Sequence, residues 1–215
     1  MTTGPSRTRH RLRILVADDH PAITRGIELL IGDQHDMVVV GIAHDADAAL
    51  DLPPCDVAVI DYHLGDRSGL WLTSRLKQRP QAPAVLLYSA FSDDVLTVAA
   101  ALAGADGVLR KSAVADELCV AIRRLGSGRR YLPRVPPSVL RALAADVDAE
   151  DRVAFQLLAE GRPAADVAEQ LGVGSDQVAA VREAALQRLS PPATRAHAPA
   201  GPRRALRRAT ELSAA

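Results

Sequence analysis

Short apolar runs alternate with longer segments of helical periodicity through the first part of the chain. The apolar runs lie at residues 12–17, 37–42, 56–60, 84–88 and 107–110. They are rich in valine, isoleucine and leucine and lack polar alternation, which is typical of strands buried on both faces. Between them apolar residues recur at helical spacing, as at Ile23, Ile27 and Leu30. Strands that alternate with helices predict βαβ crossovers and a parallel sheet covered on both sides.

The pattern changes after Gly126. Proline and arginine are frequent in residues 127–146, which we interpret as a linker with a short helix near 138–145. Three helices are expected beyond it, over residues 150–160, 163–172 and 175–189, with Ser175 as the cap of the third. The tight joint between the last two predicts a helix-turn-helix.

We therefore predict an α/β fold, a flavodoxin-like doubly wound sheet of five parallel strands, followed by a small all-α domain. The expected segments are a disordered arm (1–11), the α/β domain (12–126), the linker (127–146), the helix-turn-helix domain (147–189) and a disordered basic tail (190–215).

Charge is distributed unevenly, although the 215-residue chain has 26 basic and 26 acidic side chains. Residues 135–189 carry 5 basic and 9 acidic side chains, whereas residues 190–215 carry 5 and 1. The two cysteines, Cys55 and Cys119, have no metal-like spacing and are expected to be reduced thiols in a cytoplasmic protein. No apolar stretch is long enough to cross a bilayer, so no membrane association is expected.

Polar side chains follow four of the predicted strands. Asp18 and Asp19 follow the first strand, Asp61 ends the third, Ser89 follows the fourth and Lys111 follows the fifth. Because parallel strands end at one edge of a sheet, these groups are expected to converge there. Three carboxylates would repel one another unless a divalent cation such as Mg²⁺ (or Mn²⁺) neutralised them. The arrangement predicts a site for a metal and a phosphoryl group, in which Asp61 is the nucleophile and Lys111 and Ser89 bind phosphate oxygens.

Other residues near these positions have smaller expected roles. The backbone carbonyl of His63 is a further candidate metal ligand, and the small Ala90 leaves room for the incoming group. The side chains of His20, His44 and His63 have no partner spacing, and we expect surface or capping roles for them rather than metal binding.

These motifs resemble those of two-component response regulators of the NarL/LuxR type. The similarity covers about residues 12–126 and rests on three stretches, Ala17-Asp18-Asp19-His20-Pro21, Ser89-Ala90 and Gly104–Ser112, together with the loop that follows Asp61. The resemblance implies that Asp61 accepts phosphate from a sensor histidine kinase, with Mg²⁺ held by Asp18, Asp19 and Asp61. Two positions depart from the family pattern: Gly65 stands where proline is usual, and Val108 where an aromatic switch residue is usual.

Residues 147–189 resemble a LuxR-type helix-turn-helix. The scaffold residues match better than the surface of the last helix, where the usual Lys and His are replaced in Gln177-Val178-Ala179-Ala180-Val181. Candidate DNA contacts are Ser175, Gln177, Arg182 and Arg188, with arginines of the tail as possible additions.

The expected function is that of a DNA-binding transcriptional regulator that acts as a homodimer and is not an enzyme. One alternative is a receiver whose degenerate helix-turn-helix binds a protein partner instead of DNA. Another is a phosphatase of the haloacid dehalogenase type, but those enzymes use Asp-x-Asp on the nucleophile strand, and here Asp18-Asp19 are adjacent and precede Asp61.

Overall fold

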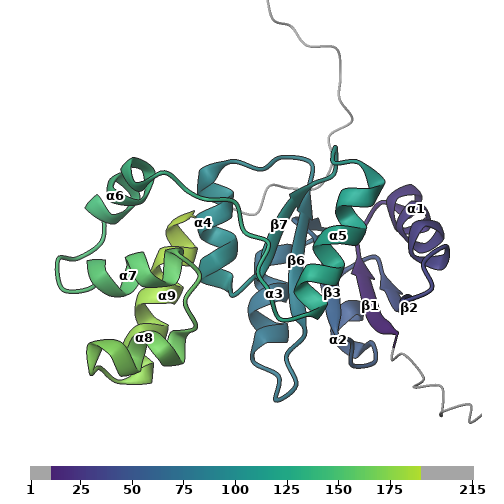
Figure 1. Cartoon of the computed structure of the whole chain (residues 1–215). Coiled ribbons are helices and arrows are strands. Elements are labelled where there is room, and N and C mark those ends of the chain that lie inside the picture. The colour runs from purple at the N-terminus through teal and green to yellow at the C-terminus, as the bar shows by residue number, and fades with distance from the viewer. Residues whose placement is uncertain (1–10, 190–215) are drawn as a thin grey trace, which may run out of the picture.

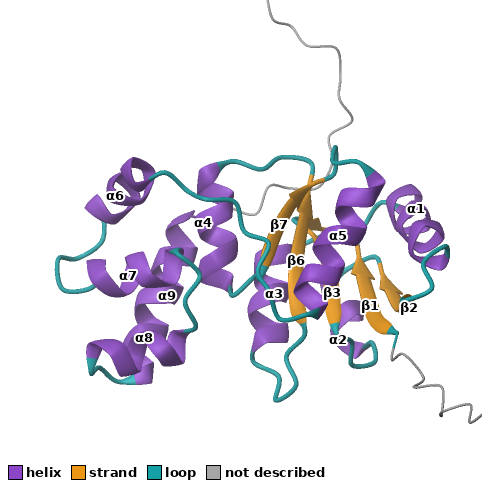
Figure 2. Ribbon diagram, viewed as in Figure 1, coloured by secondary structure: helices purple, strands orange, loops and turns teal. Residues whose placement is uncertain are grey.

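The computed structural model describes residues 11–189, and the predicted tail and all but the last residue of the predicted arm lie outside that range. Within it, five strands form one parallel sheet in the order β2-β1-β3-β6-β7 (Figure 2). The strands of this sheet are β1 (Leu12–Ala17), β2 (Met37–Ala43), β3 (Val57–Asp61), β6 (Ala84–Ser89) and β7 (Gly107–Arg110). They match the five apolar runs to within a residue at each end, and the doubly wound α/β fold is confirmed.

Helices cover both faces of the sheet, as the non-alternating strands require. The helices of this part are α1 (Pro21–Gly32), α2 (Ala46–Asp51), α3 (Gly69–Lys77), α4 (Asp94–Ala103) and α5 (Ala115–Gly126). One face packs on α1 and α5 through a cluster that contains Ile27, Ile31 and Ile122. The other face packs on α2, α3 and α4. A short hairpin lies between β3 and α3 and consists of two strands of two residues each, β4 (His63–Leu64) and β5 (Arg67–Ser68). The sequence pattern did not predict it.

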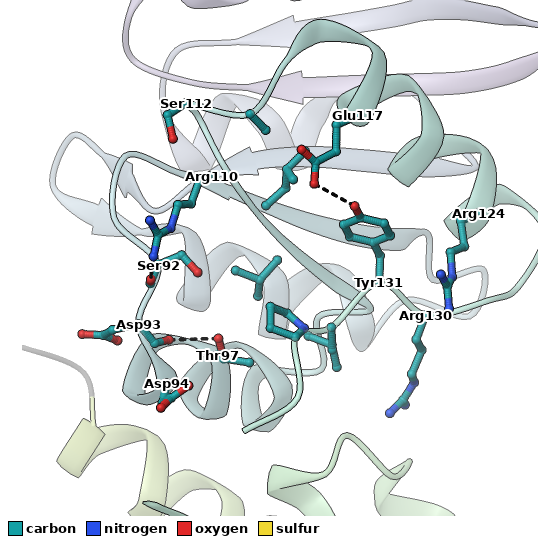
Figure 3. A pocket seen from close by; sticks show the side chains of 15 residues that line it. Ser92, Asp93, Asp94, Thr97, Arg110, Ser112, Glu117, Arg124, Arg130 and Tyr131 are labelled. Atoms are coloured by element: carbon teal, nitrogen blue, oxygen red, sulfur yellow. Dashed lines mark hydrogen bonds between the residues drawn. The ribbon is translucent and has the colours of Figure 1, made fainter. Parts of the chain in front are cut away.

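The segment after α5 runs along the free edge of the sheet before it enters a second group of helices. Tyr131 forms a parallel bridge to Gly107 of β7, and its backbone carbonyl accepts a hydrogen bond of 3.0 Å from the amide of Val108. The Tyr131 hydroxyl donates to Glu117 of α5 at 2.9 Å, and Figure 3 shows the ring pointing toward that helix. Part of the predicted linker is therefore held on the edge strand.

The second group consists of α6 (Pro137–Ala145), α7 (Arg152–Ala159), α8 (Ala164–Leu171) and α9 (Ser175–Leu189). The joint between α8 and α9 contains Gly172 at φ 65°, a left-handed conformation that glycine adopts without strain. Ser175 is the first residue of α9 rather than the capping residue before it, so that detail of the prediction is wrong by one position.

The second group of helices packs against α4, one of the helices that cover the sheet (Figure 1). Helix α9 contacts α4, and α7 also touches α4. Buried residues of both parts belong to one apolar cluster, with Val98 and Leu102 of α4 in the same cluster as Phe155 of α7 and Leu186 of α9. No helix within residues 11–189 has the length and apolarity needed to pass through a bilayer.

Candidate phosphoryl and metal site

The polar groups that follow the strands meet at one edge of the sheet, as predicted from the chain order. Asp61 is the last residue of β3, Asp18 and Asp19 follow β1, and Lys111 follows β7. Lys111 Nζ lies 2.6 Å from Asp18 Oδ2 and 2.9 Å from Asp61 Oδ2. The lysine thus bridges two carboxylates from different strands and partly neutralises them.

Burial makes this charge arrangement strong. Asp18 and Asp61 are only 2% and 4% exposed, so water screens their charges little. Burial raises the pKa of Asp61, and the nearby charge of Asp18 adds to that rise, whereas the hydrogen bond from Lys111 opposes it. Burial by itself would lower the pKa of Lys111, but its hydrogen bonds to Asp18 and Asp61 outweigh that effect and raise it. Lys111 therefore stays protonated. The ionised form of Asp61 is stabilised by this nearby positive charge.

Ser89 and Ala90 lie at the end of β6, beside the same edge. Ser89 is buried, its Oγ accepts a hydrogen bond of 3.3 Å from the amide of Phe91, and its carbonyl accepts one of 2.8 Å from the amide of Lys111. Ala90 is exposed. A hollow of about 210 Å³ is lined by Ser89 and Phe91, and by Tyr62 and His63 from the loop after β3. An acceptor side chain and an open space therefore lie next to the strand end that carries Asp61.

The loop after Asp61 is held by close backbone contacts. The amide of Gly69 donates to the carbonyl of Tyr62 at 2.7 Å, and a Cβ added at Gly69 would lie 2.1 Å from the carbonyl oxygen of Asp61. Gly65 has φ 62°, a conformation that proline is unable to adopt, so this turn differs from one with proline at that position. His63 begins β4 with an exposed side chain, two residues beyond Asp61.

Two histidines lie closer to the carboxylates than the sequence analysis expected. His20 Nδ1 is 2.7 Å from Asp19 Oδ1 and 3.2 Å from Asp18 Oδ1, and His44 Nδ1 is 3.0 Å from the Asp18 carbonyl. His20 occupies the cap position of α1 but makes no side-chain capping bond. One signal in the sequence was its direct adjacency to Asp19, but adjacency alone does not reveal which way the ring points.

Four residues offer ligand atoms that all lie within 4.8 Å of one another: Asp18, Asp19, His20 and Asp61. Carboxylates at this density fit a divalent cation, because the cation offsets their mutual repulsion. A separate cavity of about 640 Å³ lies between α4, β7 and α5 and is lined by Arg110, Arg124, Arg130 and their neighbours (Figure 3). None of the four candidate ligand residues lines it.

The predicted DNA contacts lie on α9, whose last residue, Leu189, borders the hollow that Ser89 also lines. Ser175, Gln177 and Arg188 are exposed, and Arg182 is half-buried. Arg188 Nη2 lies 3.5 Å from Asp146 Oδ2, and the two side chains are 44% and 80% exposed. The apolar side of α9, with Val178, faces the core, so the four polar residues are distributed over the rest of the helix.

Comparison with known proteins places this site in context. Residues 14–123 match the family model of the response regulator receiver domain. A probable transcriptional regulatory protein NarL of Mycobacterium tuberculosis is 29% identical over 211 residues, which cover 83% of this chain and 96% of the relative. The DNA-binding transcriptional activator DevR/DosR of the same species is 30% identical, covering 77% of this chain and 70% of the relative.

A solved structure shows the same likeness in three dimensions. The crystal structure of a LuxR-family two-component response regulator from Aurantimonas sp. SI85-9A1 is 31% identical and has a TM-score of 0.55. The match covers 66% of this chain and 99% of that one.

Proposed function

The chain belongs to the response regulator family, and on that premise we propose that Asp61 accepts a phosphoryl group from a sensor histidine kinase and that the C-terminal helices bind DNA to regulate transcription. The observation that carries the first half is the convergence of Asp18, Asp61 and Lys111 within hydrogen-bonding distance at the ends of three strands.

The transfer step follows from the chemistry of the carboxylate. A carboxylate oxygen of Asp61 attacks the phosphorus of a phosphohistidine in line with the bond that breaks. A P–O bond forms while the P–N bond breaks, and the bonding electrons leave with the imidazole nitrogen, which then takes up a proton. Lys111, held protonated between Asp18 and Asp61, is placed to pair with the new phosphoryl charge.

Asp18, Asp19 and Asp61, with the backbone carbonyl of His63, are proposed to hold Mg²⁺ (or Mn²⁺). Such an ion supplies charge neutralisation for the phosphoryl oxygens. The fit rests on the cluster of ligand atoms, which includes the buried Asp19 Oδ1. Ser89 is proposed to bind a phosphate oxygen, and Ala90 to leave space for it.

The output half of the proposal rests on α8, α9 and the relatives. Two relatives that span most of this chain are named as a transcriptional regulator and a DNA-binding activator. Ser175, Gln177, Arg182 and Arg188 of α9 are the proposed DNA contacts. Helix α9 packs on α4, so α4 covers part of its surface. The two helices would have to separate before that part of α9 could enter a DNA groove. We assign the described structure to a resting state of a cytoplasmic regulator that dimerises on DNA, with residues 12–126 and 147–189 as its two domains.

A second function keeps the receiver and replaces DNA by a protein partner. The observation in its favour is the acidic balance of residues 135–189 together with the exposed Ala180 on α9, since DNA-binding surfaces are usually basic. The two functions predict different results when the protein is exposed to genomic DNA.

Phosphorylation is tested with acetyl phosphate and Mg²⁺, followed by intact-mass measurement. Asp61→Asn should abolish phosphate incorporation, because an amide oxygen does not form a stable acyl phosphate. Asp66→Asn is the matched control, since Asp66 is an exposed aspartate five residues further along the same loop. Undiminished labelling of Asp61→Asn would place the acceptor elsewhere.

DNA binding is tested by capture of sheared genomic DNA from the source organism, with and without acetyl phosphate. Enriched palindromic sites would establish a dimeric transcription factor, whereas no enrichment from phosphorylated protein would support the protein-partner function. For an enriched site, replacing Arg182 and Arg188 by Ala should weaken binding and flatten its salt dependence. Arg141→Ala is the control, since Arg141 is an exposed arginine of α6.

A further inference from the structure

We propose that His20 supplies a nitrogen ligand at the carboxylate site, so that the site binds first-row transition-metal dications such as Co²⁺, Ni²⁺ and Zn²⁺ in preference to Mg²⁺. The proposal rests on the proposed function insofar as the carboxylates form a metal site. It adds a fourth side chain to the three carboxylates, and with it a class of ion that the carboxylates alone would not favour.

The separations of the candidate ligand atoms fit one ion. Two neighbouring ligands of a six-coordinate ion with bonds of about 2.1 Å lie roughly 3 Å apart. His20 Nδ1 lies 2.7 Å from Asp19 Oδ1 and 3.2 Å from Asp18 Oδ1, on either side of that value. All four ligand atoms lie within 4.8 Å of one another, so small movements suffice to complete the shell.

The hydrogen bonding around these atoms also indicates a ligand set. Asp19 Oδ1 is buried, and the ring nitrogen Nδ1 of His20 lies 2.7 Å from it. At that separation the two atoms share a proton when the ring is protonated at Nδ1, and a cation that takes the place of this proton would be bound by both atoms. The position of His20 at the start of α1, with its amide donating to Asp18 Oδ1 at 2.9 Å, holds the ring beside the carboxylates.

Lys111 occupies a different part of the cluster. Its ammonium contacts Oδ2 of Asp18 and of Asp61, whereas His20 lies on the Oδ1 side of Asp18. A cation beside His20 and Asp19 can therefore share Asp18 with the lysine, each using a different oxygen atom. The site need not lose Lys111 in order to gain the ion.

The imidazole nitrogen of His20 determines which ions bind more tightly to this site. Imidazole binds zinc, copper and nickel well, and affinities for mixed nitrogen and oxygen sites rise along the series from Mn²⁺ to Cu²⁺. Mg²⁺ prefers oxygen and keeps several waters, so it gains little from the ring. His20 should consequently raise affinity for transition metals without changing affinity for Mg²⁺, and these ions should compete with Mg²⁺ at the same edge.

The experiment compares the full-length wild-type chain with His20→Asn in chelator-free buffer. Calorimetric titrations with CoCl₂, ZnCl₂ and MgCl₂ give affinities, and the visible absorption of bound Co²⁺ reports nitrogen ligation directly. His20→Asn should weaken Co²⁺ and Zn²⁺ by at least about tenfold, since even residues that only support a ligand contribute that much. It should change the Co²⁺ spectrum and leave Mg²⁺ affinity unaltered. His35→Asn, an exposed histidine after α1, should match the wild type in every titration.

Equal Co²⁺ affinity and an unchanged Co²⁺ spectrum in wild type and His20→Asn would overturn the proposal. His20→Gln serves as a second variant if circular dichroism shows that His20→Asn is misfolded. Failure of the proposed function gives a different result, since wild-type protein would then incorporate no phosphate from acetyl phosphate with Mg²⁺, whatever the Co²⁺ titrations show.

Discussion

At the residue scale, the site depends on side chains that are buried together with compensating charge. Asp61 illustrates this, because its burial raises its pKa while Lys111 acts in the opposite direction. Outside the site, the clearest charge pair is Asp36 with Arg123, which joins the loop before β2 to α5. Arg123 donates to the two carboxylate oxygens of Asp36 at 2.7 and 3.0 Å, a bidentate contact.

The Asp36 pair predicts a pH-dependent contribution to stability. The hydrogen bond from Arg123, opposed by partial burial, lowers the pKa of Asp36 from 3.8 to about 2. The carboxylate therefore stabilises the folded state at pH values above 3.8, and that contribution is lost as pH falls toward 2. Because the pair is partly exposed, Asp36→Asn should lower the free energy of unfolding by about 1 kcal/mol at pH 7.

Urea unfolding of wild type and Asp36→Asn at several pH values measures this. The difference between the two proteins should shrink as pH falls below 4, because the wild-type carboxyl becomes protonated. Asp33→Asn, an exposed acid that makes no ion pair in the described structure, is the control. A difference that stays constant down to pH 2.5 would contradict the assignment to Arg123.

At the element scale, apolar runs and helical spacing were sufficient to locate most of the fold. Strands buried on both faces give continuous apolar sequence, and the polar residues that follow them were found by chain order alone. The β4–β5 hairpin was not predicted, because two-residue strands leave no periodicity. The pairing of Tyr131 with Gly107 was not predicted either, since a single bridge depends on tertiary contacts and not on the local sequence of the linker.

The linker contact predicts an effect on the edge strand. Tyr131→Ala removes the ring, which packs against the apolar cluster on the α1 and α5 face of the sheet, and the hydroxyl that donates to Glu117. We expect a loss of roughly 2 kcal/mol of stability from packing and hydrogen bonding together. Exchange of the Val108 amide, which donates to the Tyr131 carbonyl, should become faster.

Tyr131→Phe separates the two contributions. It keeps the ring and loses only the hydroxyl, so its cost should be about 1 kcal/mol, with Val108 exchange close to wild type. If Tyr131→Ala left the exchange of Val108 unaltered, the linker would not be held on β7 in solution.

At the scale of the whole molecule, the position of α9 on α4 brings the proposed output helix close to the proposed phosphorylation site. Leu189, the last residue of α9, lines the same hollow as Tyr62 and Ser89. The sequence indicated both sets of elements but not this contact, because docking between them leaves no periodic signal. The position of the His20 ring beside Asp18 and Asp19 was not predicted either, since it depends on where α1 begins relative to the carboxylates.

This arrangement predicts that phosphorylation loosens α9. Beryllium trifluoride, a mimic of the phosphoryl group, should draw Ser89 and Lys111 inward and alter the hollow that contains Leu189. To change α9 from mostly docked on α4 to mostly released, the phosphoryl group must favour the released state over the docked state by about 5 kcal/mol. Hydrogen exchange of α9 amides should accelerate and the radius of gyration from X-ray scattering should rise. Tighter DNA binding with neither change would show that the α4–α9 contact does not control the output.

The apolar cluster that the two parts share also determines how the molecule unfolds. Side chains from the face of the sheet that packs on α2, α3 and α4 form one core with the C-terminal helices, so these helices have no interior separate from that of the sheet. Heating should therefore give a single cooperative calorimetric transition. An ion that binds only at the carboxylate edge would then raise the melting temperature of α6–α9 as much as that of the sheet, because the binding free energy is distributed over the whole folding unit.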